Sequence, residues 1–150
     1  NFEELKWLQP GISWSPDGKN IVIASKSGDT DALYLINIET EKLKKLTFDL
    51  DGLFTASWSP DGNYLCFVGN RGNASDIFLY NIKSETLVNL TNDLFSDSEP
   101  VWSPDGGKLA FVSDRGAHTI KERDEDWNSL NMIEYDYSQR DIYILDVSIS

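Results

Sequence analysis

The chain has 150 residues, of which 40% are hydrophobic and 12% aromatic, a composition that can fill a globular core. Its 25 acidic residues outnumber its 13 lysines and arginines, and the net charge of −12 argues against binding to a nucleic-acid backbone. The sequence contains no continuous apolar run of the length that a membrane-spanning helix requires. Cys66 is the single cysteine, so no intrachain disulfide can form and the redox compartment stays open.

A five-residue motif, Trp-Ser-Pro-Asp-Gly, occurs three times, at residues 14–18, 58–62 and 102–106. Successive copies lie 44 residues apart, and a fixed period of this size predicts a repeat architecture. Within the motif, proline presets its own φ, aspartate bonds nearby backbone and glycine accepts a positive φ. Each copy therefore predicts a tight turn between two strands.

Each 44-residue unit contains four strand-like segments, which we call strands A to D. Strand A ends in the motif tryptophan, and strand B is apolar at every position, as in a strand covered on both faces. Cys66 falls in strand B, where it is interpreted as a small buried hydrophobe. The predicted segments are A at 12–14, 56–58 and 101–102; B at 21–24, 65–68 and 109–112; C at 33–37, 77–81 and 142–146; and D at 43–47 and 87–91.

Strands that are apolar on both faces must stack against neighbouring units, which is the logic of a β-propeller blade. The motif, the apolar strand B, a strand C that bears aromatics and ends in Asn or Asp, and the Leu-Thr that follows resemble the WD40-like repeat of TolB-type propellers. The resemblance covers residues 11–116 and resumes at 141–146. It implies an all-β fold of four-stranded antiparallel blades, and a periplasmic or cell-envelope protein that holds other proteins; a cytoplasmic location is the alternative.

The repeat predicts about three blades, half of a six-bladed ring. Propellers have about 4–8 blades, and an open arc would leave apolar blade faces in water. We therefore expect either a homodimer that completes the ring or a chain that is a fragment of a longer protein. The predicted units are residues 1–10 as a strand D closing the last blade, 11–50 as blade 1, 51–94 as blade 2, and 95–150 as blade 3 without its strand D.

An insertion interrupts the third repeat. Asn37 and Asn81 are 44 residues apart, but 65 residues separate Asn81 from Asp146, which places 21 extra residues in the B–C hairpin at about 117–140. Long loops in compact domains are usually functional or disordered, and the B–C and D–A loops emerge at the same end of each blade. The candidate partner-binding residues at this end are Arg71, Asp97, Arg115, His118, Trp127, Tyr135 and Tyr137.

Two interpretations stay open for these residues. Arg71 and Arg115 occupy equivalent positions, and they either receive a partner's carboxylates or contact an aspartate of a neighbouring loop. The insertion aromatics Trp127, Tyr135 and Tyr137 either anchor a partner or tuck the loop onto its own propeller. His118 alone, without cysteine or a second histidine, is a weak metal signal.

No catalytic constellation is present in the sequence. It has neither the Gly-x-Ser-x-Gly nucleophile motif nor a glycine-rich phosphate loop, and the acids at 49 and 51 lack the remaining ligands of a calcium loop. We therefore expect no enzymatic activity, no cofactor and no metal. The predicted function is a protein-binding scaffold that engages a protein or peptide through the B–C and D–A loops. The alternative is the substrate-gating propeller of a prolyl-oligopeptidase-type hydrolase, because similar repeats form the propeller of that family.

Overall fold

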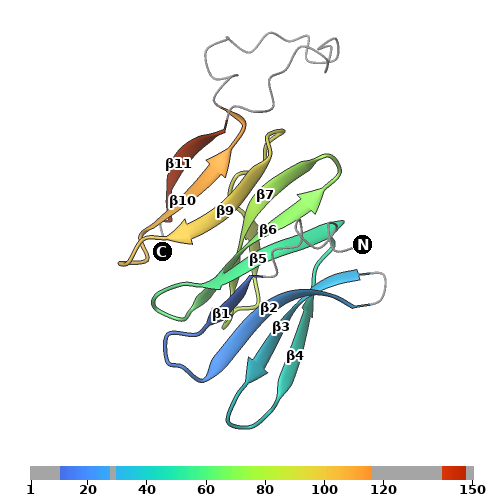
Figure 1. Cartoon of the computed structure of the whole chain (residues 1–150), viewed down its shortest axis with the longest axis vertical. Helices are drawn as coiled ribbons and strands as arrows, with labels where there is room; N and C mark the ends of the chain where they lie inside the picture. Colours follow the sequence, from blue (N-terminus) through green and yellow to red (C-terminus); the bar gives the residue numbers. More distant parts are fainter. Residues whose placement is uncertain (1–10, 28–29, 116–139, 148–150) are drawn as a thin grey trace, which may run out of the picture.

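The computed structural model describes residues 11–27, 30–115 and 140–147, and these residues form three antiparallel sheets stacked side by side (Figure 1). We call the sheets blade 1, blade 2 and blade 3. Blade 1 contains β1 (Ile12–Trp14), β2 (Asn20–Ser27), β3 (Thr30–Asn37) and β4 (Leu43–Thr47). Blade 2 contains β5 (Gly52–Trp58), β6 (Tyr64–Arg71), β7 (Ala74–Asn81) and β8 (Leu87–Asn89). Blade 3 contains β9 (Asp97–Trp102), β10 (Lys108–Ser113) and β11 (Asp141–Asp146).

The predicted all-β fold class is confirmed. Blades 1 and 2 are four-stranded with sequential strand order, and the described part of blade 3 is a three-stranded sheet ordered β11-β10-β9. The three sheets form an incomplete ring, as expected for part of a propeller. The predicted closing strand at residues 1–10 and the insertion at about 117–140 lie outside the described residues, apart from Arg140.

The three blades share one register. Ile23 pairs with Tyr34 in blade 1, and the equivalent pairs are Phe67 with Phe78 in blade 2 and Phe111 with Tyr143 in blade 3. Strand C of blade 3 is therefore equivalent to that of blade 2 at an offset of 65 residues rather than 44.

The motif turns are held by their own side chains. In the first, the Ser15 hydroxyl donates to Asp17 Oδ1 at 2.6 Å and accepts from the Asn20 amide at 2.9 Å, while Gly18 has a φ of 70°. The same bonds recur in the second and third turns. The hydrogen bond from Ser15 and the amide of Lys19 lower the pKa of the Asp17 carboxyl, although burial opposes this shift. The motif side chains therefore stabilise the turns themselves, and the same set of bonds occurs in all three blades.

Most strands are longer than the predicted segments, and strand A of blade 3 begins at Asp97 rather than residue 101. Strand A of blade 2 begins at Gly52 rather than residue 56, because an irregularity between Phe54 and Ser57, with Thr55 at a φ of 51°, lets pairing with β6 continue beyond it. Strand D of blade 2 ends at Asn89 rather than residue 91, where the Asn89 and Thr91 side chains bond the Asp76 carboxylate.

The core lies between the blades and forms two clusters. The first joins residues of blade 1, such as Val22 and Leu33, to residues of blade 2, such as Phe67 and Phe78. The second joins the opposite side of blade 2, including Cys66 and Ile77, to Leu109 and Phe111 of blade 3. Each blade therefore buries its apolar faces against its neighbours rather than within itself.

Candidate binding face

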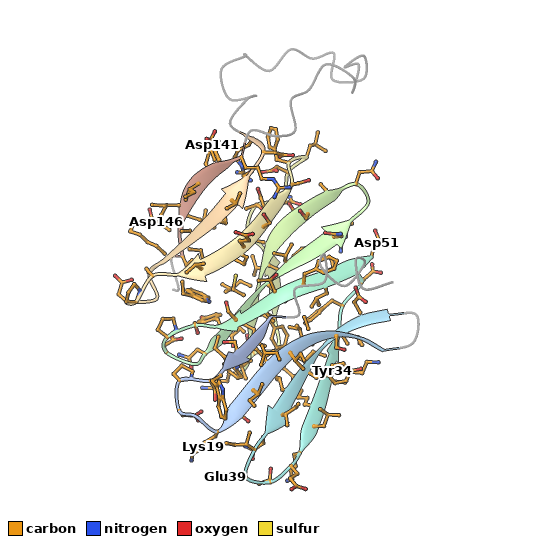
Figure 2. The ribbon with its side chains drawn as sticks, in the orientation of Figure 1. Lys19, Tyr34, Glu39, Asp51, Asp141 and Asp146 are labelled. Atoms are coloured by element: carbon orange, nitrogen blue, oxygen red, sulfur yellow. The ribbon has the colours of Figure 1, made fainter. Side chains whose placement is uncertain are left out.

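The loops at one end of the blades differ in sequence and length from one repeat to the next, and we call this end the loop face. It consists of the D–A loops 48–51 and 90–96, the B–C turn of blade 2 and the two ends of the blade 3 insertion. In blade 1, Lys19 and Glu39 mark the opposite end, with the motif turns, whereas Asp51 lies at the loop face (Figure 2). Asp141, where β11 begins after the insertion, also lies at the loop face (Figure 2).

Arg115 is the centre of a charged cluster at this face. Its Nη2 atom lies 2.7 Å and 2.6 Å from the two carboxylate oxygens of Asp97, and 3.0 Å from Oδ2 of Asp93. Its Nε donates to the Ser113 hydroxyl at 2.8 Å. The Asp97 side chain is 0% exposed and that of Arg115 is 18% exposed, so this ion pair is largely withdrawn from water. Charge-assisted bonds of this kind are about twice as strong as neutral ones.

Three aromatic rings surround the Arg115 guanidinium. Its central carbon lies 5.2 Å from the ring centroids of Phe111 and Tyr143, and 5.7 Å from that of Phe95. The rings come from β10, β11 and the preceding D–A loop, so one side chain ties together three segments of the loop face. The two strands that flank the insertion are among them.

Two further carboxylates adjoin this ion pair. Asp76 of β7 accepts hydrogen bonds from the Asn89 side-chain amide at 2.8 Å and from the Thr91 hydroxyl at 3.2 Å. Burial raises the pKa of Asp93, and the charges of Asp97 and Asp76 add to the shift; the Phe95 amide and Arg115 oppose it. Burial outweighs the Arg115 contact, because Arg115 is shared with Asp97.

Among the described residues, Asp76, Asp93 and Asp97 form one acidic group in which a metal ion could be held, with carboxylate oxygens within 4.8 Å of one another. However, Arg115 lies against two of the three carboxylates. One positive charge of the cluster is therefore supplied by the protein, and Asp76 is bonded to amide and hydroxyl groups.

Arg71 has a different environment although its position in the repeat is the same. Its Nη2 donates to the backbone carbonyl of Asp49 at 3.1 Å, and its side chain is exposed. The neighbouring Gly72 amide donates to Asp51 Oδ2 at 2.7 Å. Arg71 thus keeps donors available to a second molecule, whereas Arg115 is committed to Asp97 and Asp93.

The structure brings together only some of the predicted site residues. The repeat pattern predicts Asp97 in a D–A loop, but it is the first residue of β9 and its carboxylate pairs with Arg115. His118, Trp127, Tyr135 and Tyr137 lie outside the described residues. The sequence reasoning missed Asp76, Asp93 and Ser113. A signal for Asp76 is present in the sequence, because it is a charge at a position where the equivalent strand of blade 1 has Ala32.

The stacked sheets, the shared register and the inter-blade cores define a partial β-propeller. A family model described as the TolB beta propeller domain matches residues 13–140, so the chain belongs to this family. A search of curated proteins gave no match. No helix among the described residues is long and apolar enough to cross a membrane.

Solved structures give the same fold. TolB from Acinetobacter baumannii superposes with a TM-score of 0.68 at 23% identity, over 95% of this chain and 31% of that one. A structure assigned as TolB from Agrobacterium tumefaciens gives 0.62 at 27% identity, over 67% of this chain and 36% of that one. The tricorn protease gives 0.59 at 18% identity, over 70% of this chain and 11% of that one. The chain therefore spans about a third of the length of the TolB structures it matches.

Proposed function

We propose that this chain is a non-enzymatic scaffold that holds a protein or peptide partner at its loop face. The observation that carries the proposal is the anchoring of the insertion. Ser113 and Arg115, just before it, are bonded to each other, and Arg115 is fixed to Asp97; Asp141, just after it, pairs with Ser113. A binding loop whose two ends are held in place loses less conformational entropy when a partner binds.

The chemistry of the face suits an amphipathic partner. The exposed Arg71 offers guanidinium donors to a carboxylate, and the insertion supplies His118, Trp127, Tyr135 and Tyr137. Arg115 and Asp97 belong to the site as positioning residues that hold its base. The family membership favours a periplasmic or cell-envelope location, and a cytoplasmic location is the alternative.

The test is partner capture with the double variant Trp127→Ala/Tyr135→Ala. We expect this variant to retain at most about one tenth of the partner that the unchanged chain retains, because aromatic anchors carry most of the binding energy of such contacts. Val88→Ala is the control, since Val88 lies on β8, the outermost strand of blade 2, and is not one of the candidate partner-binding residues. Equal capture by the double variant, with an unchanged far-ultraviolet spectrum, would overturn the proposal.

A second function has one observation in its favour. The tricorn protease shares the fold, so a propeller of this kind is compatible with a place in a hydrolase. In that case the chain would gate the access of substrate to a catalytic domain elsewhere in the protein. A Gly-x-Ser-x-Gly motif encoded downstream of Ser150 would support this alternative, and a stop codon there would favour the dimer.

Ring completion is part of the proposal in both cases. The missing blades come either from a second copy of the chain or from the remainder of a longer protein. The share of the TolB structures that the chain covers is compatible with either source.

A further inference from the structure

A hollow of about 500 Å³ lies at the end of blade 2 that is opposite the loop face. It is bounded by the A–B turn that contains the second motif and by the C–D turn of the same blade. The equivalent turns of blade 1 carry Lys19 and Glu39, which Figure 2 shows at this end. Small-molecule sites usually have volumes of about 300–1,000 Å³, so the hollow is large enough for a small ligand. The lining residues are Asn63, Tyr64, Asn81, Lys83 and Ser84.

One pair of side chains at this end is bonded in blades 1 and 3 but not in blade 2. Its two members lie where strand B begins and strand C ends, and they are partners in the register of each blade. In blade 1, the Asn37 side-chain amide donates to Asn20 Oδ1 at 3.1 Å. In blade 3, the Lys108 ammonium pairs with the Asp146 carboxylate. The pair in blade 2 is Tyr64 and Asn81, which form no such bond with each other, so the space beside them stays open.

The Asn81 amide is held in one orientation by its own turn. Its Oδ1 atom accepts hydrogen bonds from the backbone amides of Lys83 and Ser84, each at 2.9 Å. Asn37 is held in the same way in blade 1, but its Nδ2 atom has Asn20 as an acceptor. Asn81 Nδ2 has no acceptor within the part of the chain that the structure describes. Its two N–H donors are therefore available to an acceptor from a second molecule.

Lys83 gives the hollow a positive charge. The equivalent residue of blade 1 is Glu39, so this charge is not a general feature of the repeat. The acids of the two bounding turns are already bonded, because Asp61 accepts hydrogen bonds within its motif turn and Glu85 pairs with Lys44. None of the five lining residues is acidic, and Lys83 forms no ion pair with any described residue. The hollow therefore offers one cation and neutral donors, which suit an anion.

We propose that this hollow binds a carboxylate that carries a small apolar group. The carboxylate oxygens accept hydrogen bonds from the Lys83 ammonium and from the Asn81 side-chain amide. Hydrogen bonds in which both partners are charged are about twice as strong as neutral ones, and a carboxylate can accept from two donors at once. The apolar group of the ligand lies against the Tyr64 side chain, which supplies the one aromatic surface of the hollow.

The test is a titration of the whole isotope-labelled chain with benzoate, followed by nuclear magnetic resonance. We expect saturable shifts of the Asn81 side-chain amide and of the backbone amides of Lys83 and Ser84. The Kd should be on the order of a few millimolar for a ligand of this size. Benzyl alcohol has the same ring without the carboxylate and is expected to give no saturable shift. Equal binding of the two compounds, or no saturable shift with benzoate well above that Kd, would overturn the proposal.

Lys83→Glu gives blade 2 the residue of blade 1 at an exposed position of the turn. It is expected to weaken benzoate binding at least about tenfold, because an attractive charge becomes a repulsive one. Lys19→Glu is the matched control, since it makes the same change in net charge at an exposed residue of blade 1, and it should keep the Kd. Equal weakening by the two variants would show only a general effect of charge and would contradict the site.

Tyr64→Asn tests the open pair independently. It gives blade 2 the two asparagines that are bonded in blade 1, so the Asn81 amide gains an acceptor and the hollow loses its ring. We expect this variant to lose the saturable shifts. Benzoate binding that is unchanged in Tyr64→Asn would be evidence against the assigned contacts.

A carboxylate of this kind can be a free small molecule or the C-terminus of a peptide. Titration with the tripeptide Gly-Gly-Phe distinguishes the two sources: tighter binding than benzoate supports a peptide terminus, and weaker binding supports a free carboxylate. The hollow is distant from the loop face, so this inference goes beyond the proposed function. Trp127→Ala/Tyr135→Ala should bind benzoate normally, and Lys83→Glu should capture the protein partner normally, so the failure of one proposal is distinguishable from that of the other.

Discussion

Removing the guanidinium of Arg115 is the most informative single change to the loop face. Arg115→Met keeps most of the aliphatic stem but leaves the Asp97 carboxylate, 0% exposed, without the guanidinium that pairs with it. Breaking a buried ion pair by removing one member typically costs about 3–5 kcal/mol. The free energy of unfolding of a domain of this size is about 5–15 kcal/mol, so the substitution is expected to remove a large part of it.

The repeat supplies a matched control for this change. Arg71→Met alters the equivalent residue of blade 2, which is exposed and donates one described hydrogen bond to a backbone carbonyl. We expect its loss to cost about 0.5–1 kcal/mol. The assay is urea denaturation followed by tryptophan fluorescence, at one fixed chain concentration because association changes apparent stability.

The repeat also supplies a rescue. The residue equivalent to Asp97 in blade 2 is Leu53, which is buried in the core between blades 1 and 2. Adding Asp97→Leu to Arg115→Met removes the stranded charge and should recover most of the lost stability, since apolar replacements of buried ion pairs are often neutral. The reasoning is refuted if Arg115→Met costs no more than Arg71→Met, or if the double variant is less stable than Arg115→Met alone.

Two further predictions concern titratable groups. Burial raises the pKa of the Cys66 thiol, so we expect a thiol reagent to label the folded chain far more slowly than the urea-unfolded chain, and equal rates would contradict the packing of β6. Asp93 also has a raised pKa in the fold, so its contribution to stability is complete below its ordinary pKa of 3.8 and is lost as the pH rises through the raised value. The free energy of unfolding of Asp93→Asn minus that of the unchanged chain should therefore increase between about pH 3 and pH 6, measured by urea titration at each pH, and a decrease would refute this account.

The blade structure was predictable because its determinants are local and repeated. Each motif turn is closed by a serine, an aspartate and a glycine within a few residues of one another, so the sequence contains the whole device. The packing of the blades against one another was predictable from the apolar strands, since such strands must be covered on both sides. The start of β5 was not predictable in this way, because it depends on an irregularity with Thr55 at a positive φ.

The different environments of Arg71 and Arg115 could not be predicted from the repeat pattern alone. Both arginines have the same offset from their motif, which favoured one role for both. The surrounding positions differ: Asp97 replaces Leu53, Ser113 replaces Gly69, and Phe95 replaces Asp51. Each replacement gives Arg115 a bonding or stacking partner that Arg71 lacks. These partners come from three places along the chain, so only the folded arrangement identifies them as one cluster.

The ion pair between Arg115 and Asp97 lies in blade 3 and has no equivalent in blade 2, where Leu53 stands at the position of Asp97. Blade 2 joins its strands B and C by a short turn after Arg71, while blade 3 carries the insertion between Arg115 and Asp141. A long excursion of the chain removes the restraint that a tight hairpin places on its two strands. The bonds of Arg115 to Asp97 and Ser113, and its stacking on Tyr143, hold the start of the insertion against β9, β10 and β11. The buried ion pair therefore holds the start of the insertion in place. Its removal is expected to lower the stability of the chain first, and to weaken partner binding through that loss of stability.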